Sequence, residues 1–443
     1  MPELESKPSH KMEQTSQARQ PIRKLSLYYI WTIGCQMNKA ESERLSSYLE
    51  QLGYQPTPTA EKADLVVLNS CVVRQSAERR VINKLNSLKS LKRLRPGLTL
   101  AVTGCLVNSE VDQLKNNFPQ VDYLFKPGNC PEWLGKAELA QVLPQHPSPS
   151  TFVPIIQGCN NFCSYCIVPY RRGRERSRPV EEITDEVKEL VHRGVKEVTL
   201  LGQNVDSYGQ NLPNKPDLAD LLTELNTIDG LARIRFLTNH PKDMGTKLIE
   251  AIAYLDKVCE LICLPAQSGD NDILKAMRRG YTVEQYRQLI TQIRSKIPGV
   301  ALSTDVIVGF PSESTSQFQQ TVNLLSELRF DTVHVAAYST RPETIAARKF
   351  EDNIPLDEKR KRLHVIEQLQ ESIATEINVH LLDKTVEVLV EGKKKGRWQS
   401  RTRSGKLVFF NNNNDCLGQL MKIRIEKTSP WSLQGKVESS SAN

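Results

Sequence analysis

The stretch VPIIQGCNNFCSYCIVPYRRGRERSRP, from Val153 to Pro179, decides what the rest of the chain must build. It places Cys159, Cys163 and Cys166 in a CxxxCxxC spacing directly after a short apolar strand. Three thiolates with no fourth cysteine or histidine beside them do not complete a tetrahedral zinc site. They suit an iron–sulfur cluster in which cysteines hold three irons and the fourth iron stays open for a ligand. The spacing therefore favours an iron–sulfur site over an incidental or zinc-binding group of cysteines.

The same spacing resembles the signature of the radical S-adenosylmethionine (SAM) enzymes, and the sequence Ser164–Tyr165–Cys166 continues the resemblance. In that family the open iron chelates the amino and carboxylate groups of SAM. The resemblance implies that SAM is a cofactor and that Cys159, Cys163 and Cys166 hold a 4Fe-4S cluster.

The size and composition of the chain are those of a multidomain globular protein. Its 443 residues exceed one ordinary domain, and 39% of them are hydrophobic. No apolar run approaches the length of a membrane span, so we expect no membrane contact. Residues 1–25 are polar and have no apolar signal region, so we expect a disordered leader there.

Charge and cysteine content indicate which class of partner the protein binds and in which cellular compartment it works. The net charge of +8 favours an anionic partner such as nucleic acid. Ten cysteines without an export signal are expected as metal ligands or buried thiols rather than disulfides. A reducing, cytoplasmic location follows from this expectation.

Residues 26–143 predict a doubly wound α/β domain, because continuous apolar strands alternate with helices. The first three strands end at Cys35, Cys71 and Cys105. Since the carboxyl ends of parallel strands share one edge of a sheet, these cysteines are expected to converge there. They predict a second three-cysteine cluster site, with buried structural cysteines as the alternative. A final helix is expected over residues 131–143.

Residues 144–376 predict a partial (β/α)6 barrel, because six strands alternate with helices from Val153 onward. A barrel of this kind places its site at the carboxyl ends of its strands. Polar residues and glycines stand at those ends, and we expect the cofactor to contact the following residues: Gly202, Gln203, Asn204, Gln267 and Ser268. Asn239 and His240 follow the third strand, and Gly309 and Pro311 follow the fifth.

Two basic segments leave open whether their charge is structural or binds an anion. The segment directly after the CxxxCxxC loop contains five arginines, for which we favour contact with SAM or RNA over pairing with acids: Arg171, Arg172, Arg174, Arg176 and Arg178. The helix after Cys71 carries seven cations, for which a solvated face and RNA contact are equally supported: Arg79, Arg80, Lys84, Lys89, Lys92, Arg93 and Arg95. The remaining cysteines, Cys130, Cys259, Cys263 and Cys416, follow no such pattern and are expected to be core or incidental residues.

Residues 377–440 predict a small all-β barrel of the oligonucleotide-binding sort. From Asn378 to the end, twelve Lys and Arg face six Asp and Glu, which leaves +6 on this module. Four aromatic residues are interleaved with the charges: Trp398, Phe409, Phe410 and Trp431. The combination favours RNA binding over a merely solvated basic surface.

Nearly the whole chain, from Leu27 to Val437, resembles the radical SAM methylthiotransferases, in particular their tRNA-modifying MiaB branch. The matching motifs are GCQMN from Gly34, the CxxxCxxC run, LLGQNVDSYG, RIRFLTNHP, LPAQSG and DVIVGFP. The chain departs from the family pattern at Glu343 and Ser312, where glycine is favoured, and at Asn239, where serine is more usual. These departures put fine substrate preference in doubt, not the cysteine sites.

The resemblance implies a C-terminal TRAM domain and two 4Fe-4S clusters, the auxiliary one held by Cys35, Cys71 and Cys105. It implies methylthiolation of carbon 2 of isopentenyladenosine at position 37 of tRNA, next to the anticodon. The implied partners are the tRNA anticodon stem-loop, an electron donor such as flavodoxin or ferredoxin, and a sulfur donor. The alternatives are methylthiolation of threonylcarbamoyladenosine or of a ribosomal-protein aspartate, and a non-catalytic iron–sulfur RNA-binding protein.

Overall fold

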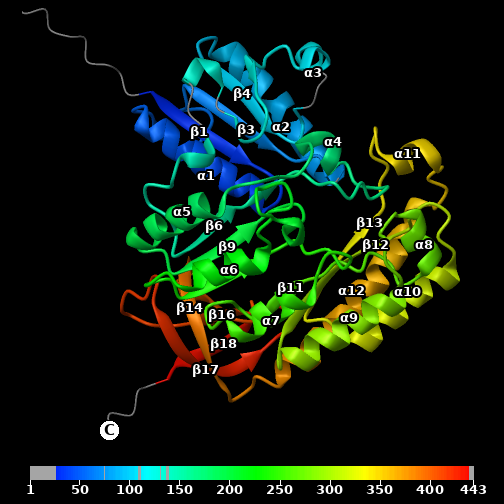
Figure 1. The fold of residues 1–443 in the computed structure, drawn as a ribbon. Helices are drawn as coiled ribbons and strands as arrows, with labels where there is room; N and C mark the ends of the chain where they lie inside the picture. The colour runs from blue at the N-terminus through cyan, green and yellow to red at the C-terminus, as the bar shows by residue number, and fades with distance from the viewer. Residues whose placement is uncertain (1–25, 74, 108–110, 130, 136–138, 439–443) are drawn as a thin grey trace, which may run out of the picture.

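A computed structural model describes residues 26–438 except 74, 108–110, 130 and 136–138. The expected leader over residues 1–25 and Cys130 lie outside these described residues. Three layered units follow one another along the chain, with the N-terminal unit at the top of Figure 1, a helix-covered arc in the middle and a small barrel below.

The N-terminal unit is a five-stranded parallel sheet in the order β2-β1-β3-β4-β5. Its elements are β1 (Leu27–Thr32), α1 (Gln36–Gln51), β2 (Gln55–Pro56), β3 (Leu65–Ser70), α2 (Gln75–Leu94), β4 (Thr99–Gly104), α3 (Val111–Asn117) and β5 (Tyr123–Leu124).

The central strand of this sheet, β3, is covered on both faces. Leu65 and Val67 pack in a core with residues of α1, whereas Val66 and Leu68 pack in a second core with residues of α2. Alternate side chains of a strand point to opposite faces, so helices cover both sides of the sheet. The predicted doubly wound arrangement is confirmed.

The helix expected over residues 131–143 is replaced by two short 3-10 turns, Glu132–Leu134 and Leu139–Gln141. Gly135 lies between them with φ +115°, a backbone conformation that ends helical geometry. A Cβ atom at this position would lie 2.7 Å from the hydroxyl of Tyr48, which donates a hydrogen bond to the carbonyl of Leu134. The close approach of Tyr48 therefore requires glycine at this position.

The middle unit is an arc of six parallel strands, as predicted. One half pairs β6 (Ser150–Pro154), β9 (Glu197–Leu201) and β10 (Arg233–Phe236), and the other pairs β11 (Leu261–Cys263), β12 (Ala301–Val308) and β13 (Thr332–Ala337). A parallel bridge from Ile234 to Val258 stands at the junction of the two halves.

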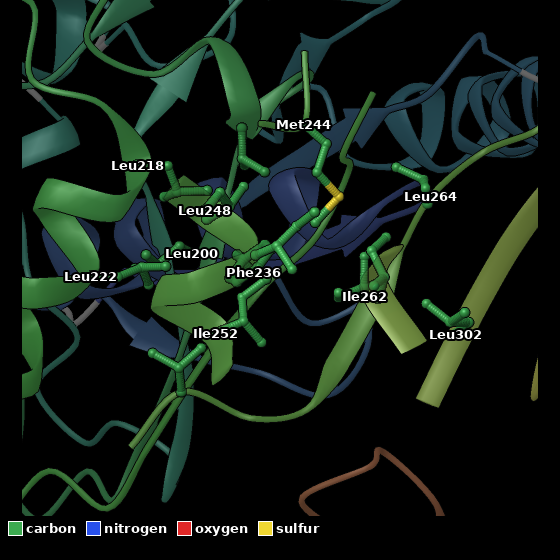
Figure 2. Close-up of a cluster of buried hydrophobic side chains, with 14 of the residues drawn as sticks. Leu200, Leu218, Leu222, Phe236, Met244, Leu248, Ile252, Ile262, Leu264 and Leu302 are labelled. Atoms are coloured by element: carbon green, nitrogen blue, oxygen red, sulfur yellow. The ribbon is translucent and has the colours of Figure 1, made fainter. Parts of the chain in front are cut away.

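Helices cover the outer side of the arc, as Figure 1 shows. They are α5 (Val180–His192), α6 (Leu218–Asn226), α7 (Thr246–Tyr254), α8 (Asn271–Ala276), α9 (Val283–Lys296), α10 (Thr315–Leu328) and α12 (Leu356–Val379). Figure 2 shows part of the core beneath them, in which leucines of α6 and α7 meet Leu200, Phe236 and Ile262 of the strands. None of the described helices is both long and apolar enough to cross a membrane.

The C-terminal unit is a closed five-stranded barrel in the order β14-β15-β16-β18-β17. Its strands are β14 (Thr385–Lys394), β15 (Arg397–Thr402), β16 (Leu407–Phe410), β17 (Leu420–Thr428) and β18 (Leu433–Val437). The expected domain boundary after residue 376 falls inside α12, which continues to Val379.

Two buried arginines at the amino ends of the arc fasten this barrel. Arg233 donates to the carbonyl of Arg401 at 2.8 Å, and Arg235 donates to the carbonyls of Thr402 and Arg403 at 2.7 and 2.6 Å. The buried carboxylate of Glu197 lies 2.9 Å from Nε of Arg235. The small barrel therefore caps the end of the arc opposite to the carboxyl ends of its strands.

Replacing Arg235 with Met is expected to lower the free energy of unfolding by about 3 kcal/mol, because it leaves Glu197 buried with its nearest cation removed. Equilibrium denaturation followed by circular dichroism measures this change. Arg424→Met is the matched control, because the Arg424–Asp383 pair is exposed and is worth less than about 1 kcal/mol. Equal losses in the two variants would contradict the role given to the buried pair.

Candidate metal centres and the cavity between them

The CxxxCxxC loop is held in place by hydrogen bonds from three directions. The loop follows β7 (Ile156–Gln157) and leads into the short helix α4 (Val168–Arg172). Gly158 N donates to Oε1 of Gln203 at 2.6 Å, Cys159 N to the carbonyl of Gly173 at 3.2 Å, and Ser164 N to the carbonyl of Met277 at 2.9 Å. These contacts fix both ends of the loop against the arc.

Burial makes the thiols of this loop costly to ionise without a cation. It raises the pKa of Cys159 to about 11 and that of Cys166 to about 12, and in both cases the nearby Cys163 adds to the rise. The guanidinium of Arg279 lies in the same pocket, with its Nη1 3.3 Å from Sγ of Cys163. Arg279 is itself buried and is held by the carbonyl of Pro265 at 3.1 Å. Arg279 thus places one buried positive charge beside thiols that burial otherwise keeps protonated.

Cys35, Cys71 and Cys105 lie at the same edge of the N-terminal sheet, directly after β1, β3 and β4. A Cβ atom on Gly34 would lie 2.7 Å from Cβ of Cys71, so the first two strand ends meet closely. Burial raises the pKa of Cys105 to about 11, Arg172 opposes this rise, and the nearby Cys71 and Cys35 add to it. The three cysteines therefore lie within electrostatic reach of one another.

The donor sets fit 4Fe-4S clusters better than single ions. Among the described residues, no group of three or more His, Cys, Asp and Glu side chains is arranged to hold one metal ion. A cubane takes one thiolate per iron and so needs its cysteines spread around a larger body. Each place offers three cysteines that are free thiols, and their holding three irons of a cubane with the fourth iron open stays a prediction.

A cavity of about 480 Å³ is lined by residues of both the N-terminal unit and the arc. The N-terminal unit contributes Val73, Gln75 and Ser76, which follow Cys71 closely in the chain. The cluster loop contributes Cys166 with its neighbours Tyr165 and Ile167, and the remaining wall comes from β12, β13 and their flanking segments. Its volume lies in the range of small-molecule binding pockets, and its wall includes Cys166 and the segment that follows Cys71.

Of the five residues expected to contact SAM, Gln267 lines this cavity. Its backbone has φ +67°, and its Oε1 is buried without a hydrogen-bond partner in the described part of the chain. A strained residue with an unused acceptor is typical of a ligand site. Its contact with SAM stays a prediction.

The other four expected residues have structural partners. Gln203 holds the cluster loop, and a Cβ atom on Gly202 would clash with Ile156 at 2.3 Å. Asn204 donates to Asp243 at 2.8 Å, and the buried Ser268 accepts from the backbone N of Asp270 at 3.2 Å. These contacts give each residue a role in shaping the site, and direct contact with the cofactor stays a prediction.

Asp206 joins the ends of two neighbouring strands through a buried carboxylate. It accepts hydrogen bonds from Nδ2 of Asn239 and, at 2.8 Å, from the backbone N of His240. Burial raises the pKa of Asp206 to about 7, although these two hydrogen bonds oppose the rise. Burial also lowers the pKa of His240 to about 2, so its imidazole is neutral at physiological pH.

Replacing Asp206 with Asn is expected to change how stability depends on pH. The folded protein retains the Asp206 proton up to about pH 7, whereas the unfolded chain loses it near its ordinary pKa of 3.8. The folded state therefore binds more protons between these values, and this carboxyl makes stability fall as pH rises through that window. The free energy of unfolding of wild type minus that of Asp206→Asn should decrease between about pH 4 and 7 and then level off.

Urea denaturation of metal-free protein at several pH values measures this difference, with the exposed Asp256→Asn as control. A constant difference across the window would contradict the assignment of a raised pKa to Asp206.

The five arginines after the loop are mostly paired within the protein, contrary to the favoured expectation of anion contact. Arg171 pairs with Glu343 at 2.9 Å, and Arg172 pairs with Glu41 at 2.6 Å. Arg178 pairs with Glu182 and Glu186 at 2.8 and 2.6 Å, and Arg174 lies over the ring of Phe162. Among the five, Arg174 and Arg176 remain exposed.

Glu343 and Ser312, which stand where the resembled family favours glycine, both have left-handed backbones, with φ +74° and +64°. Glycine adopts this region without steric cost, which is the physical reason for the family preference. Here the pair with Arg171 holds Glu343, and Asn353 accepts a hydrogen bond from the backbone N of Ser312 at 2.8 Å. Neither residue lines the cavity.

Three residues with contacts at the site were not singled out from the sequence: Arg279, Asp206 and Asp243. In the sequence, Arg279 belongs to the triplet Arg278–Arg279–Gly280 after an expected helix. Nothing in that triplet indicates contact with Cys163, which lies more than a hundred residues earlier. The two aspartates stood near predicted strand ends, so the same rule that selected Asn204 would have selected them.

Of the four aromatic residues expected to interleave with charge in the C-terminal unit, Trp398 and Phe410 are buried in its core. Phe409 is half-buried beneath Arg397, and Trp431 is 58% exposed. Trp431 lines a second cavity, of about 370 Å³, together with Arg401, Lys406 and His334. His334 also lines the large cavity, so the two cavities adjoin along β13.

Comparison with known proteins agrees with the three units. The radical SAM superfamily model matches residues 153–325, the uncharacterized protein family UPF0004 model matches residues 27–126, and the TRAM domain model matches residues 382–437. The solved structure of the radical SAM methyltransferase TsrM from Kitasatospora setae has a similar fold, with a TM-score of 0.55 at 14% identity over 73% of this chain and 77% of that one. The chain is a radical SAM protein with an N-terminal UPF0004 domain and a C-terminal TRAM domain.

Curated relatives define the family more narrowly. Proteins named tRNA-2-methylthio-N(6)-dimethylallyladenosine synthase match from Dehalococcoides mccartyi (55% identity, 93% of this chain and 98% of the relative), Roseiflexus (48%, 95% and 91%) and Clostridium botulinum (44%, 94% and 98%). The chain belongs to this family, the MiaB tRNA methylthiotransferases.

Proposed function

We propose that the protein adds a methylthio group to carbon 2 of isopentenyladenosine at position 37 of tRNA, using SAM and two 4Fe-4S clusters. The observation that carries this proposal is the single cavity bordered by Cys166 on one side and by the segment after Cys71 on the other. A base in that cavity would lie between the two cysteine sets. The names of the family members favour dimethylallyladenosine over threonylcarbamoyladenosine and a ribosomal protein.

The cavity wall suits a nucleoside with an apolar substituent. Ile167, Val306, Ala336, Ala337 and Leu363 offer apolar surface to an isopentenyl group. Gln267 and Asp305 add polar atoms to the same wall. When bound, the cluster at Cys159, Cys163 and Cys166 together with SAM supplies the radical chemistry that an unactivated aromatic C–H bond requires.

The protein's own residues hold and enclose these groups. Gln203 and Ser164 fix the loop that presents the thiols, and Arg279 places a buried positive charge beside Cys163. The two cysteine-bearing units are joined by the buried pair of Arg172 with Glu41. This arrangement would keep the two centres at a fixed separation.

Partners and compartment complete the proposal. The anticodon stem-loop would extend from the cavity past His334 to the basic TRAM barrel, whose β14–β15 turn exposes Lys394 and Lys395. An electron donor such as flavodoxin or ferredoxin and a separate sulfur donor are required by the chemistry. Free thiols at all described cysteines fit a reducing cytoplasm.

Replacing Cys159, Cys163 and Cys166 with Ala is expected to halve the iron content of anaerobically reconstituted protein, from about eight to about four irons per chain. Iron and sulfide analysis measures the change, and the absorbance near 400 nm should fall by roughly half with it. Cys416→Ala is the control, because this buried thiol belongs to the TRAM core and should leave all irons bound. A full complement of iron in the triple variant would refute the assignment.

Replacing Cys35, Cys71 and Cys105 with Ala is expected to separate the two halves of the reaction. The variant should still cleave SAM to 5′-deoxyadenosine, because the loop at Cys159 is intact, but should form no methylthio nucleoside. Mass spectrometry of both products, with isopentenylated anticodon stem-loop under anaerobic conditions, tests this. Normal methylthiolation would exclude the auxiliary site, and loss of both products in folded protein would show that the centres are coupled.

A further inference from the structure

The outward face of α2 carries positive charge that the folded chain does not neutralise. Arg79, Arg80, Lys89 and Arg93 are exposed. In the part of the chain that the structure describes, no acid lies within ion-pair distance of any of them. The sequence supported a solvated face and RNA contact equally for this helix, and the exposed charges bear on that choice.

The remaining cations of the segment have structural partners, which separates them from this face. Lys92 pairs with Asp122 at 2.7 Å, and Arg95 pairs with Asp64 at 3.0 Å. Lys84 lies 5.9 Å from the ring centre of Tyr29. The single acid of α2, Glu78, is taken up by Arg341 at 2.6 Å.

The chemistry between the exposed cations suits a polyanion rather than a protein. Val81, Leu85 and Leu88 turn into the core, so the opposite side presents Asn83, Asn86 and Ser90 beside the cations. Protein interfaces need an apolar or aromatic centre, and here the exposed apolar residue Leu94 stands at the far end of the helix. Amide and hydroxyl donors interspersed with arginines are typical of phosphate contact.

The position of α2 connects this face to the candidate site. Gln75 and Ser76, in its first turn, line the large cavity together with Cys166. The helix has 20 residues and so extends roughly 30 Å away from the cavity. On the other side, the cavity adjoins the TRAM barrel through His334. A nucleic acid whose base occupies the cavity would therefore reach both surfaces.

We propose that the outward face of α2 binds the phosphate backbone of the substrate RNA on the side of the cavity away from the TRAM domain. The inference rests on the proposed function, since it concerns how the same RNA is held. Each cation that contacts a phosphate releases counterions from the RNA, and the base in the cavity is thereby held from two sides. The cations contribute to binding and do not touch the reacting atoms.

The test compares two full-length variants that lose the same charge. In the first, Arg79, Arg80, Lys89 and Arg93 become Gln. In the matched control, four exposed lysines on the outer side of the arc become Gln: Lys188, Lys215, Lys247 and Lys296. Both changes lower the formal net charge from +8 to +4, so a difference between the variants reports position rather than total charge.

Binding of a labelled isopentenylated anticodon stem-loop is measured by fluorescence anisotropy over a series of KCl concentrations. The α2 variant should bind at least about tenfold more weakly near 0.15 M salt, and its slope of log affinity against log salt should be shallower by about three. The control should keep the wild-type slope. SAM cleavage without RNA should be unchanged in both, and the α2 variant should show a raised KM with little change in kcat.

A wild-type slope and affinity in the α2 variant would overturn the inference. So would a variant that binds RNA normally but loses turnover with an acidic electron carrier and regains it with dithionite, since that result would assign the face to a protein partner. If the wild-type protein binds the stem-loop through α2 but forms no methylthio product, the proposed function fails and the inference stands.

Discussion

The buried ion pair between Arg172 and Glu41 joins the two segments that follow the cysteine sets. Glu41 follows Cys35 by six residues in α1, and Arg172 follows Cys166 by six residues in α4. Burial works against the charge on Arg172, but Glu41 and then Cys105 raise its pKa above the ordinary value. Breaking a pair of this kind costs about 3–5 kcal/mol. The pair thus acts together with an apolar cluster that the two units share, in which Met37 and Ala40 pack with Leu201.

The two ends of the arc have different roles. Thiols, buried charges and the large cavity gather at the carboxyl ends of the strands, where parallel sheets accept ligands. The amino ends carry Arg233 and Arg235, which donate to backbone carbonyls of the TRAM barrel. TRAM side chains add to this attachment, because Arg403 pairs with Glu260 and Lys406 pairs with Asp331, each at 2.7 Å.

Much of the architecture could be predicted from the sequence because it is set by local signals. Alternating apolar strands and helices were enough to give the parallel sheets, and strand-end cysteines were enough to bring Cys35, Cys71 and Cys105 to one edge. The small C-terminal β-barrel also followed from its short strands and turn residues, whereas the order of its strands is known only from the structure.

The partners of individual polar residues could not be predicted, because they depend on contacts between distant parts of the chain. The position of Gln203 at a strand end predicted contact with the cofactor, but not that its amide oxygen accepts a hydrogen bond from Gly158 N. The sequence suggested that the arginines after the loop were free to bind an anion. In the folded protein, Arg171 and Arg172 instead pair with Glu343 and Glu41, which are distant in the sequence. Only the folded protein shows which face of α2 stays without acids.

The helix α12 limits where the length of this chain can change. Leu356, at its first turn, lines the large cavity, and its last residues reach Asn378 beside the TRAM barrel. Its 24 residues form one continuous helix that spans roughly 36 Å. Inserting or deleting a single residue would turn everything beyond it by about 100° and shift it by about 1.5 Å. We therefore expect insertions and deletions within α12 to disrupt the fold, whereas surface loops tolerate them.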